Sequence, residues 1–279
     1  MPTDQMMHFQ GHRLWLRHGG QGPALLLIHG FPTCGADWDP LWDALQSRHR
    51  LFAIDMIGFG RSDKPLDYPY SIAASADQWQ ELVQQQGLHD VAILAHDYGN
   101  TVAQELLARQ REGNLGFQIR QVVFLNGGLF PEATHPLLLQ KLLRGPFGPL
   151  VARLSSYRSF AASLRRICAQ PLDEAWLRQQ WEWLVRAQGR RVMPRIVQYM
   201  HERRVHRERW LGALVGAGVP LHLINGIEDP ISGRTIVSRW HELLPEAPVV
   251  ELPGVGHYPQ VEAPQRVLDA LQTVLPTHA

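Results

Sequence analysis

Three absences narrow what this chain of 279 residues can be. Its two cysteines, Cys34 and Cys168, are too few for a disulfide framework, and no Cys or His spacing is typical of a metal site. No apolar run approaches the roughly 18 residues of a membrane-spanning helix, and Met1 to Gln10 is polar, unlike a signal peptide. We therefore expect a cytoplasmic protein with no transmembrane segment, no metal and no other cofactor.

The net charge of +1 hides an uneven distribution. Residues 131–210 hold 15 Lys and Arg against 6 Asp and Glu, a net +9, whereas the rest of the chain holds 12 against 20, a net −8. Nothing in the basic segment has the pattern of a nucleic-acid-binding module. Its charge is that of a solvated helical face, or of a surface that attracts an anionic substrate, an acidic membrane or a partner.

Short apolar runs alternate with helix-like segments along most of the chain. This alternation is typical of an α/β fold with a mostly parallel sheet and helices on both of its faces. Alternating side chains from His12 to Arg17 predict one further, antiparallel strand. The predicted parallel strands are 24–28, 51–56, 91–94, 122–125, 221–224 and 249–252, and the predicted helices are 38–45, 72–86, 102–111, 235–244 and 264–274.

The alternation stops near Phe130, and the following residues, rich in Leu, Arg and Trp, predict helices alone. We therefore expect a sheet domain formed by residues 1–130 and 211–279, with a helical cap inserted at 131–210. Ligands bind outside the carboxyl ends of parallel strands, which is where such an insertion would lie. The alternative is a helical subdomain that never meets the substrate.

The segment Ala95-His96-Asp97-Tyr98-Gly99 is the most informative part of the sequence. It lies between a predicted strand and a predicted helix, the context of a nucleophile elbow, but Asp97 replaces the usual serine. No Gly-x-Ser-x-Gly occurs elsewhere in the chain. A carboxylate in this position favours displacement at carbon through an alkyl-enzyme ester. The alternative is that Asp97 only caps the helix that follows.

An ester on Asp97 must be hydrolysed, which requires a general base for water, usually a histidine oriented by an acid. His257 follows the last predicted strand and Asp229 follows the preceding one, so the three residues occur in the chain order of this type of triad. Glu228 is the competing acid, but neighbours on an extended chain point in opposite directions. Asn126, at the end of another strand, cannot supply a charge.

Hydrolysis of the ester passes through an oxyanion that backbone N–H groups should surround. We expect one donor from Tyr98, the residue after the nucleophile, and the other from Phe31 in the loop His29-Gly30-Phe31-Pro32. Each such donor is typically worth about 3 kcal/mol of barrier. Pro32 has no N–H and stiffens the loop that holds Phe31.

Several longer motifs are similar to those of a known family. Through these motifs the chain resembles the α/β-hydrolases of the epoxide hydrolase and haloalkane dehalogenase branch. Within this branch it resembles the mesoderm-specific transcript subfamily. The likeness extends from about His12 to the C-terminus. Animal members carry a membrane-inserting N-terminus, which this sequence lacks. The motifs are His29-Gly30-Phe31-Pro32-Thr33, Asp55 to Pro65, His96 to Glu105, Asn126 to Glu132 and Gly256-His257-Tyr258-Pro259-Gln260.

The resemblance implies epoxide hydrolysis, in which cap tyrosines donate a proton to the epoxide oxygen as it becomes an alkoxide. Of the six tyrosines, only Tyr157 and Tyr199 lie in the inserted segment. Tyr199, in Gln198-Tyr199-Met200-His201-Glu202-Arg203, matches the segment that carries one ring-opening tyrosine in the family. Tyr157 is the weaker candidate for the second donor and for a place in the pocket. The alternative for Tyr199 is a core aromatic on a cap helix.

Two alternatives to epoxide hydrolysis stay open. Haloalkane dehalogenases bind halide with an indole after the nucleophile and an amide in the oxyanion loop, where this chain has Tyr98 and Phe31. A non-catalytic binding protein on the same scaffold is the second alternative. The Trp-rich insertion, and Trp38 as an expected pocket wall, favour a small hydrophobic substrate, first of all an epoxide. The sequence supports no prediction of oligomeric state.

Overall fold

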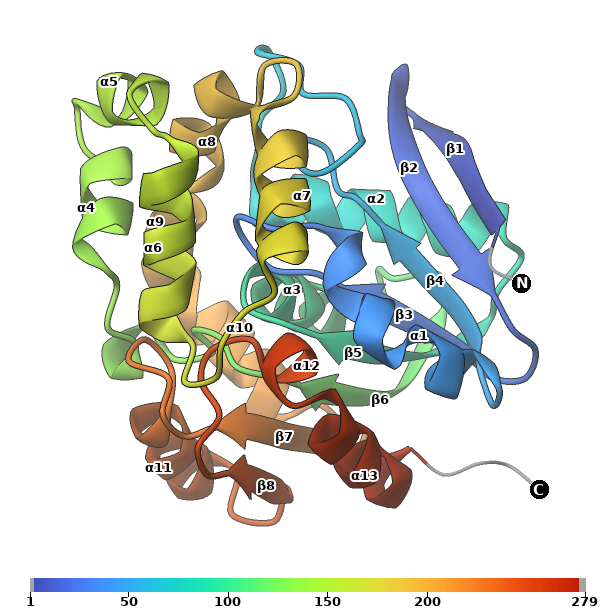
Figure 1. Ribbon diagram of the computed structural model, residues 1–279. Helices are drawn as coiled ribbons and strands as arrows, with labels where there is room; N and C mark the ends of the chain where they lie inside the picture. The colour runs from blue at the N-terminus through green and yellow to red at the C-terminus, as the bar shows by residue number, and fades with distance from the viewer. Residues whose placement is uncertain (1–2, 276–279) are drawn as a thin grey trace.

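An eight-stranded sheet forms the centre of the computed structural model, which describes residues 3–275 (Figure 1). The strand order is β1-β2-β4-β3-β5-β6-β7-β8, and every pair from β4 to β8 is parallel. The mostly parallel sheet expected from the sequence is therefore confirmed. The strands are β1 (Thr3–Phe9), β2 (His12–Gly19), β3 (Ala24–Ile28), β4 (Arg50–Ile54), β5 (Asp90–Ala95), β6 (Gln118–Phe124), β7 (Leu221–Gly226) and β8 (Val249–Leu252).

The amino-terminal edge of the sheet contains one strand that the sequence did not predict. β2 pairs antiparallel with β4, as expected for the segment from His12, and β1 pairs antiparallel with β2. In β1 only Met7 and Phe9 are buried, while its first four residues are exposed. An edge strand that buries so little has a weak apolar alternation, which explains why β1 was missed.

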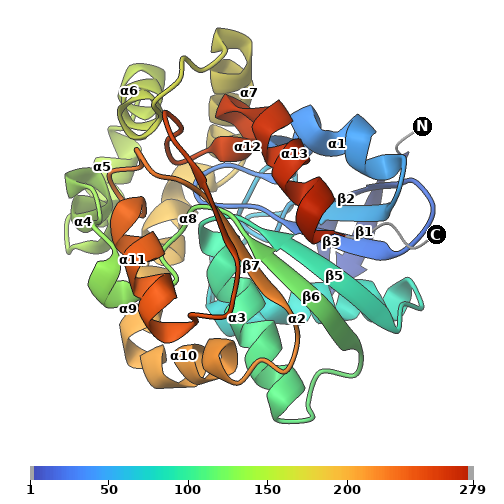
Figure 2. The same cartoon turned by 90° about the horizontal axis from the view of Figure 1, so that it is seen from below.

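Helices cover both faces of the sheet (Figure 2). A separate apolar core lies beneath each layer of helices. Trp42 and Leu271 belong to the core under one layer, and Trp79 and Trp240 to the core under the other. The first layer is formed by η1 (Gly35–Trp38), α1 (Asp39–Gln46), α12 (Pro259–Glu262) and α13 (Pro264–Val274), and the second by α2 (Ile72–Gln85), α3 (Tyr98–Arg111) and α11 (Arg234–Leu243).

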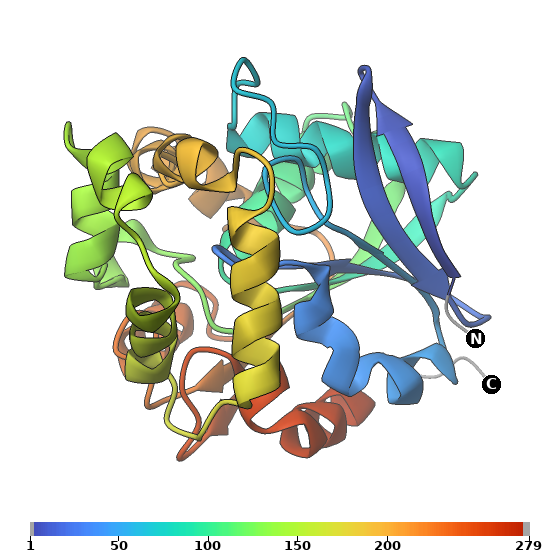
Figure 3. The same ribbon diagram turned by 45° about the horizontal axis from the view of Figure 1, so that its top comes forward.

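Between β6 and β7 the chain forms helices only, which we call the helical insert (residues 131–215). The predicted limit at residue 210 falls inside its last helix. The insert lies to one side of the sheet, with α4 and α5 farthest from the strands (Figures 1 and 3). Its elements are η2 (Pro131–Ala133), α4 (Leu138–Arg144), α5 (Gly148–Arg153), α6 (Tyr157–Ile167), α7 (Glu174–Val185), α8 (Gly189–Ile196), α9 (Tyr199–Val205) and α10 (Arg207–Val215).

Polar contacts fix the helical insert on the sheet domain. Glu105 of α3 accepts hydrogen bonds from Trp210 Nε1 at 2.9 Å and from Arg209 Nε at 3.1 Å, both on α10. Gln180 of α7 donates to the buried carboxyl group of Asp37 in η1 at 3.3 Å. Buried polar groups left without partners are costly, so these pairs specify where the insert sits. None of the helices within residues 3–275 is long and apolar enough to cross a membrane.

Candidate active site

Asp97 lies in a strained turn between β5 and α3. Its φ of 45° and ψ of −103° are rare for a residue with a side chain. Its neighbours approach closely, since a Cβ on Gly99 would lie 2.3 Å from the carbonyl oxygen of Ile28 and one on Gly127 would lie 2.6 Å from Asp97 Cα. Asp97 occupies the N-cap position of α3, but its side chain makes no capping hydrogen bond. The helix-capping alternative therefore lacks the contact on which it depends.

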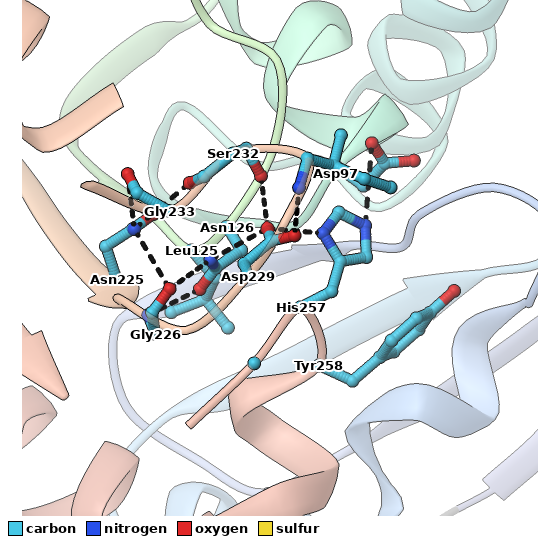
Figure 4. Close-up of polar contacts among 12 residues, drawn as sticks. Asp97, Leu125, Asn126, Asn225, Gly226, Asp229, Ser232, Gly233, His257 and Tyr258 are labelled. Carbon is cyan, nitrogen blue, oxygen red and sulfur yellow. Dashed lines mark hydrogen bonds and ion pairs between the residues drawn. The ribbon is translucent and has the colours of Figure 1, made fainter. Parts of the chain in front are cut away.

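His257 lies between two carboxylates (Figure 4). Its Nδ1 is 2.7 Å from Asp229 Oδ2, and its Nε2 is 3.9 Å from Asp97 Oδ1. His257 follows β8, Asp229 follows β7 and Asp97 follows β5, so the three buried side chains lie at one edge of the sheet. Glu228, the competing acid, faces outward and pairs with Arg234. The structure thus brings together Asp97, Asp229 and His257.

The two carboxylates change the protonation of His257. Burial alone would lower the pKa of His257, but Asp229 and then Asp97 raise it to about 9. Burial would likewise raise the pKa of Asp229, but His257, the Ser232 hydroxyl and the Ile231 N–H hold it below its usual value. In the free protein near pH 7, His257 is therefore protonated and Asp229 ionised.

Asn126 joins the turn that carries Asp97 to Asp229, a link that the sequence analysis did not predict. Its backbone carbonyl accepts the N–H of Asp97 at 2.8 Å, and its side chain donates to Asp229 Oδ2 at 3.0 Å. Ser232 Oγ donates to the same oxygen at 2.5 Å. The sequence signal was the position of Asn126 just past β6, since the loops after β5, β6 and β7 meet at one edge.

The two predicted oxyanion donors are Tyr98, the residue after Asp97, and Phe31, in the loop after β3. The N–H of Phe31 donates to Asp97 Oδ2 at 3.1 Å. Tyr98 is the first residue of α3, so its N–H has no intrahelical acceptor. The hydroxyl of Tyr98 lies 2.7 Å from Ser75 Oγ, away from any role at the carboxylate.

Tyr199, the first residue of α9, packs against Tyr98 and Phe31. Its ring is T-shaped on Tyr98 with centroids 4.9 Å apart, and it is 6.1 Å from the ring of Phe31. Burial and the nearby charge of Asp97 raise the pKa of Tyr199 well above its usual value. Its hydroxyl therefore stays protonated throughout the physiological range and can act as a donor.

A buried arginine from the helical insert completes the surroundings of Asp97. Arg203 of α9 donates from Nη2 to the backbone carbonyl of Asp97 at 2.9 Å and from Nε to Thr101 Oγ1 at 2.7 Å. The same Nη2 is 3.8 Å from Asp97 Oδ1. A Cβ on Gly128 would lie 2.3 Å from Arg203 Nη1, so a side chain at this position would displace the guanidinium. In the sequence, Arg203 ended the motif quoted for Tyr199, but nothing marked it as a site residue among the fifteen basic residues of its segment.

A second buried histidine, His96, holds the loop that carries His257. His96 Nε2 lies 2.8 Å from the backbone oxygen of His257, so this nitrogen carries the proton and donates. Burial and the charge of His257 lower the pKa of His96 to about 3. His96 is thus neutral and fixes the loop that carries His257. Among residues 3–275, no group of three or more His, Cys, Asp or Glu is arranged to hold a metal ion.

A cavity of about 340 Å³ leads away from the site and ends on Phe31 and His257. Its walls come mainly from α4, α5 and α6 and are largely apolar, with a few serine hydroxyls from α6. Neither Asp97 nor Tyr199 is among its lining residues. Leu139, Leu143, Val151, Phe160, Leu164 and Trp181 form much of the wall.

Two residues expected in the pocket lie elsewhere. Trp38, the last residue of η1, is fully buried in the core between the sheet and α1. Tyr157 starts α6 at the surface of the helical insert, where its hydroxyl donates to Glu174 Oε1 at 2.6 Å. We correct both assignments: neither residue forms a wall of the cavity, and Tyr157 is not positioned as a ring-opening donor.

Residues 25–270 match the sequence model of the Alpha/beta hydrolase family. The chain belongs to this family. The hydrolase is 38% identical to LipZ of Mycobacterium tuberculosis over 266 residues, which cover 94% of this chain and 92% of LipZ. It is 37% identical to the mesoderm-specific transcript homolog protein of Homo sapiens over 262 residues, 90% of this chain and 78% of that protein. The subfamily resemblance is thereby confirmed.

Solved structures share the fold of the hydrolase at low sequence identity. The epoxide hydrolase CorEH superposes with a TM-score of 0.77 at 20% identity, covering 98% of both chains. The haloalkane dehalogenase DbeA from Bradyrhizobium elkani gives a TM-score of 0.82 at 19% identity, covering 99% of this chain and 98% of DbeA. These likenesses establish the α/β-hydrolase fold and leave the choice of reaction to the site.

The free energy of unfolding of the hydrolase should depend on pH through His257. Its folded-state pKa of about 9 lies above its ordinary value of 6.5, so its contribution is complete below pH 6.5 and is lost as pH rises through 9. The expected loss is on the order of 3 kcal/mol. Urea unfolding at pH 6 to 9.5 should show this decline in the wild type and in the exposed-site control His241→Gln. His257→Gln should have a flatter profile, and an equally steep one would contradict the assignment.

Proposed function

We propose that this hydrolase opens epoxides to vicinal diols through a covalent ester of Asp97. The observation that carries the proposal is a buried carboxylate at the nucleophile turn with the protonated phenol of Tyr199 packed beside it. A carboxylate can displace an oxygen leaving group at carbon, and an epoxide opens readily only when its oxygen receives a proton. Both requirements are met by residues within one small region.

In the first step the two oxygens of Asp97 have different roles. Oδ2 accepts the N–H of Phe31, so Oδ1 attacks the less hindered epoxide carbon. The bond between that carbon and the ring oxygen breaks as Tyr199 gives its proton to the oxygen. Arg203 holds the backbone of the turn through the carbonyl of Asp97 and keeps the carboxylate in place during the attack.

In the second step ester formation itself prepares the base. Because the charge of Asp97 raises the pKa of His257, its loss in the ester lowers that pKa, so His257 releases a proton to solvent and becomes the neutral imidazole; it takes a proton up again when the Asp97 carboxylate is restored. His257 then takes a proton from water, and the resulting hydroxide attacks Cγ of Asp97. The oxyanion forms on Oδ2, where the N–H groups of Phe31 and Tyr98 stabilise it.

The collapse of this intermediate closes the cycle. The bond between Cγ and Oδ1 breaks, and His257 returns its proton to the departing diol oxygen. The new carboxyl group of Asp97 gives up its remaining proton, which restores the phenol of Tyr199. One water is consumed per epoxide, and one carboxylate oxygen of Asp97 is exchanged in each turnover.

A single turnover in heavy-oxygen water tests this path. With enzyme in excess over epoxide, the label should appear in the peptide that contains Asp97 and be absent from the diol, because the diol receives the old Oδ1. After many turnovers the diol should carry the label. If the first diol is already labelled and the peptide is not, water attacks the epoxide directly and the proposal is wrong.

The site offers less to a halide than to an epoxide. Tyr98, directly after the nucleophile, has a hydroxyl engaged with Ser75, and Phe31 offers only an apolar side chain. The guanidinium of Arg203 is already bound to the carbonyl of Asp97 and to Thr101. Epoxide opening therefore fits these residues better than dehalogenation does, and the apolar cavity favours a lipophilic epoxide.

A further inference from the structure

Large apolar side chains are exposed along the outer side of α4 and α5. Leu138, Phe147 and Leu154 are 70%, 71% and 73% exposed, and Leu142 and Leu150 are about half exposed. The two helices pack against each other, and we call the five exposed side chains that they carry the apolar face. Exposed apolar side chains gathered on neighbouring helices are typical of a docking site.

Basic residues border the apolar face with the same spacing on both helices. On α4, Leu138, Lys141 and Leu142 are three and four residues apart, and positions with this spacing share one side of a helix. Leu150, Arg153 and Leu154 repeat the pattern at α5. The apolar face therefore carries a cation on each of its two helices.

No acid lies near the apolar face in the chain. Residues 133–172 contain six Lys and Arg and no Asp or Glu. Within the described part of the chain, only Arg165 of these six forms an ion pair, with Glu174 of α7. A surface that combines exposed apolar side chains with unpaired cations is complementary to a layer with an anionic surface and an apolar interior.

The apolar face also forms the outer side of the cavity wall. Leu139 and Leu143 of α4 and Val151 of α5 point inward and line the cavity that ends on His257. Leu154 is both exposed and part of this lining. One layer of short helices thus separates the apolar face from the cavity.

We infer that the apolar face of α4 and α5 binds an anionic lipid surface and that substrate enters the cavity from the side of this face. The docking does not depend on the reaction proposed for Asp97, so it can be measured with the inactive Asp97→Asn variant as well as with the wild type. The basic character of the helical insert, which the reaction itself does not require, then has a function.

Vesicle flotation of the full chain tests the inference. Binding to phosphatidylcholine vesicles that contain phosphatidylglycerol should exceed binding to phosphatidylcholine alone by roughly fivefold or more, and it should weaken as salt is raised. Leu138→Ser with Phe147→Ser should lower binding by roughly tenfold or more. Lys141→Glu with Arg153→Glu should remove the preference for anionic vesicles.

Matched controls separate this face from the rest of the insert. Val205→Ser with Val215→Ser removes two comparably exposed apolar side chains, and Arg191→Glu with Arg204→Glu reverses two exposed charges, all outside the apolar face. Both controls should bind as the wild type does. Absence of wild-type binding, or equal binding by the face variants, would overturn the inference. So would a dimer, seen by ultracentrifugation, that Leu138→Ser with Phe147→Ser dissociates while vesicle binding is absent, since the face would then join two copies.

Discussion

Replacing His257 with glutamine should stop the hydrolase after its first step. Glutamine keeps much of the size of the imidazole but cannot remove a proton from water, and general-base catalysis is worth about 10²–10⁴-fold. Steady-state turnover should fall by at least that factor while ester formation on Asp97 continues. Intact-protein mass spectrometry of the variant with an epoxide should therefore show an added mass equal to that of the epoxide.

The distance between His257 and Asp97 explains why replacing His257 should block ester hydrolysis and leave ester formation intact. Its Nε2 lies 3.9 Å from Asp97 Oδ1, beyond hydrogen-bond distance, so the first attack does not require a bond between them. The double variant Asp97→Asn with His257→Gln is the control and should gain no mass. Normal turnover by His257→Gln, or no adduct from an epoxide that the wild type consumes, would exclude the proposed base.

Residues at strand ends were the part of this site that sequence could locate. Asp97, Asp229 and His257 each follow an apolar run, and in a parallel sheet the loops after such runs meet at one edge. The six parallel strands from β3 to β8 were predicted within a few residues of their observed limits, because each contains a short apolar run.

Residues that depend on packing between segments could not be found in this way. Arg203 reaches Asp97 only because α9 folds back over the turn, and no local pattern encodes that contact. Trp38 and Tyr157 were misplaced for the same reason, since their surroundings come from α1 and from Glu174 rather than from the site. Asn126 was passed over because it has no charge, although its amide links Asp97 and Asp229.

Tyr199→Phe should affect the opposite step from His257→Gln. The substitution keeps the ring that packs on Tyr98 and Phe31 and removes only the hydroxyl, so the fold and the oxyanion donors should persist. Without the proton donor, ester formation from an epoxide should slow by about 10²–10⁴-fold. Hydrolysis of the ester, which uses His257 and water, should keep its wild-type rate.

Rapid-mixing measurements of the two steps distinguish a proton donor from a structural residue. With Tyr199→Phe, ester formation should become rate-limiting and little ester should accumulate, whereas His257→Gln accumulates it fully. Tyr157→Phe is the matched control and should change neither rate, because its hydroxyl is bound to Glu174 at the surface. If Tyr199→Phe slows both steps equally, the phenol only supports packing, and if it slows neither, another group protonates the epoxide oxygen. Slower ester formation with an unchanged rate of ester hydrolysis is the result that identifies Tyr199 as the proton donor.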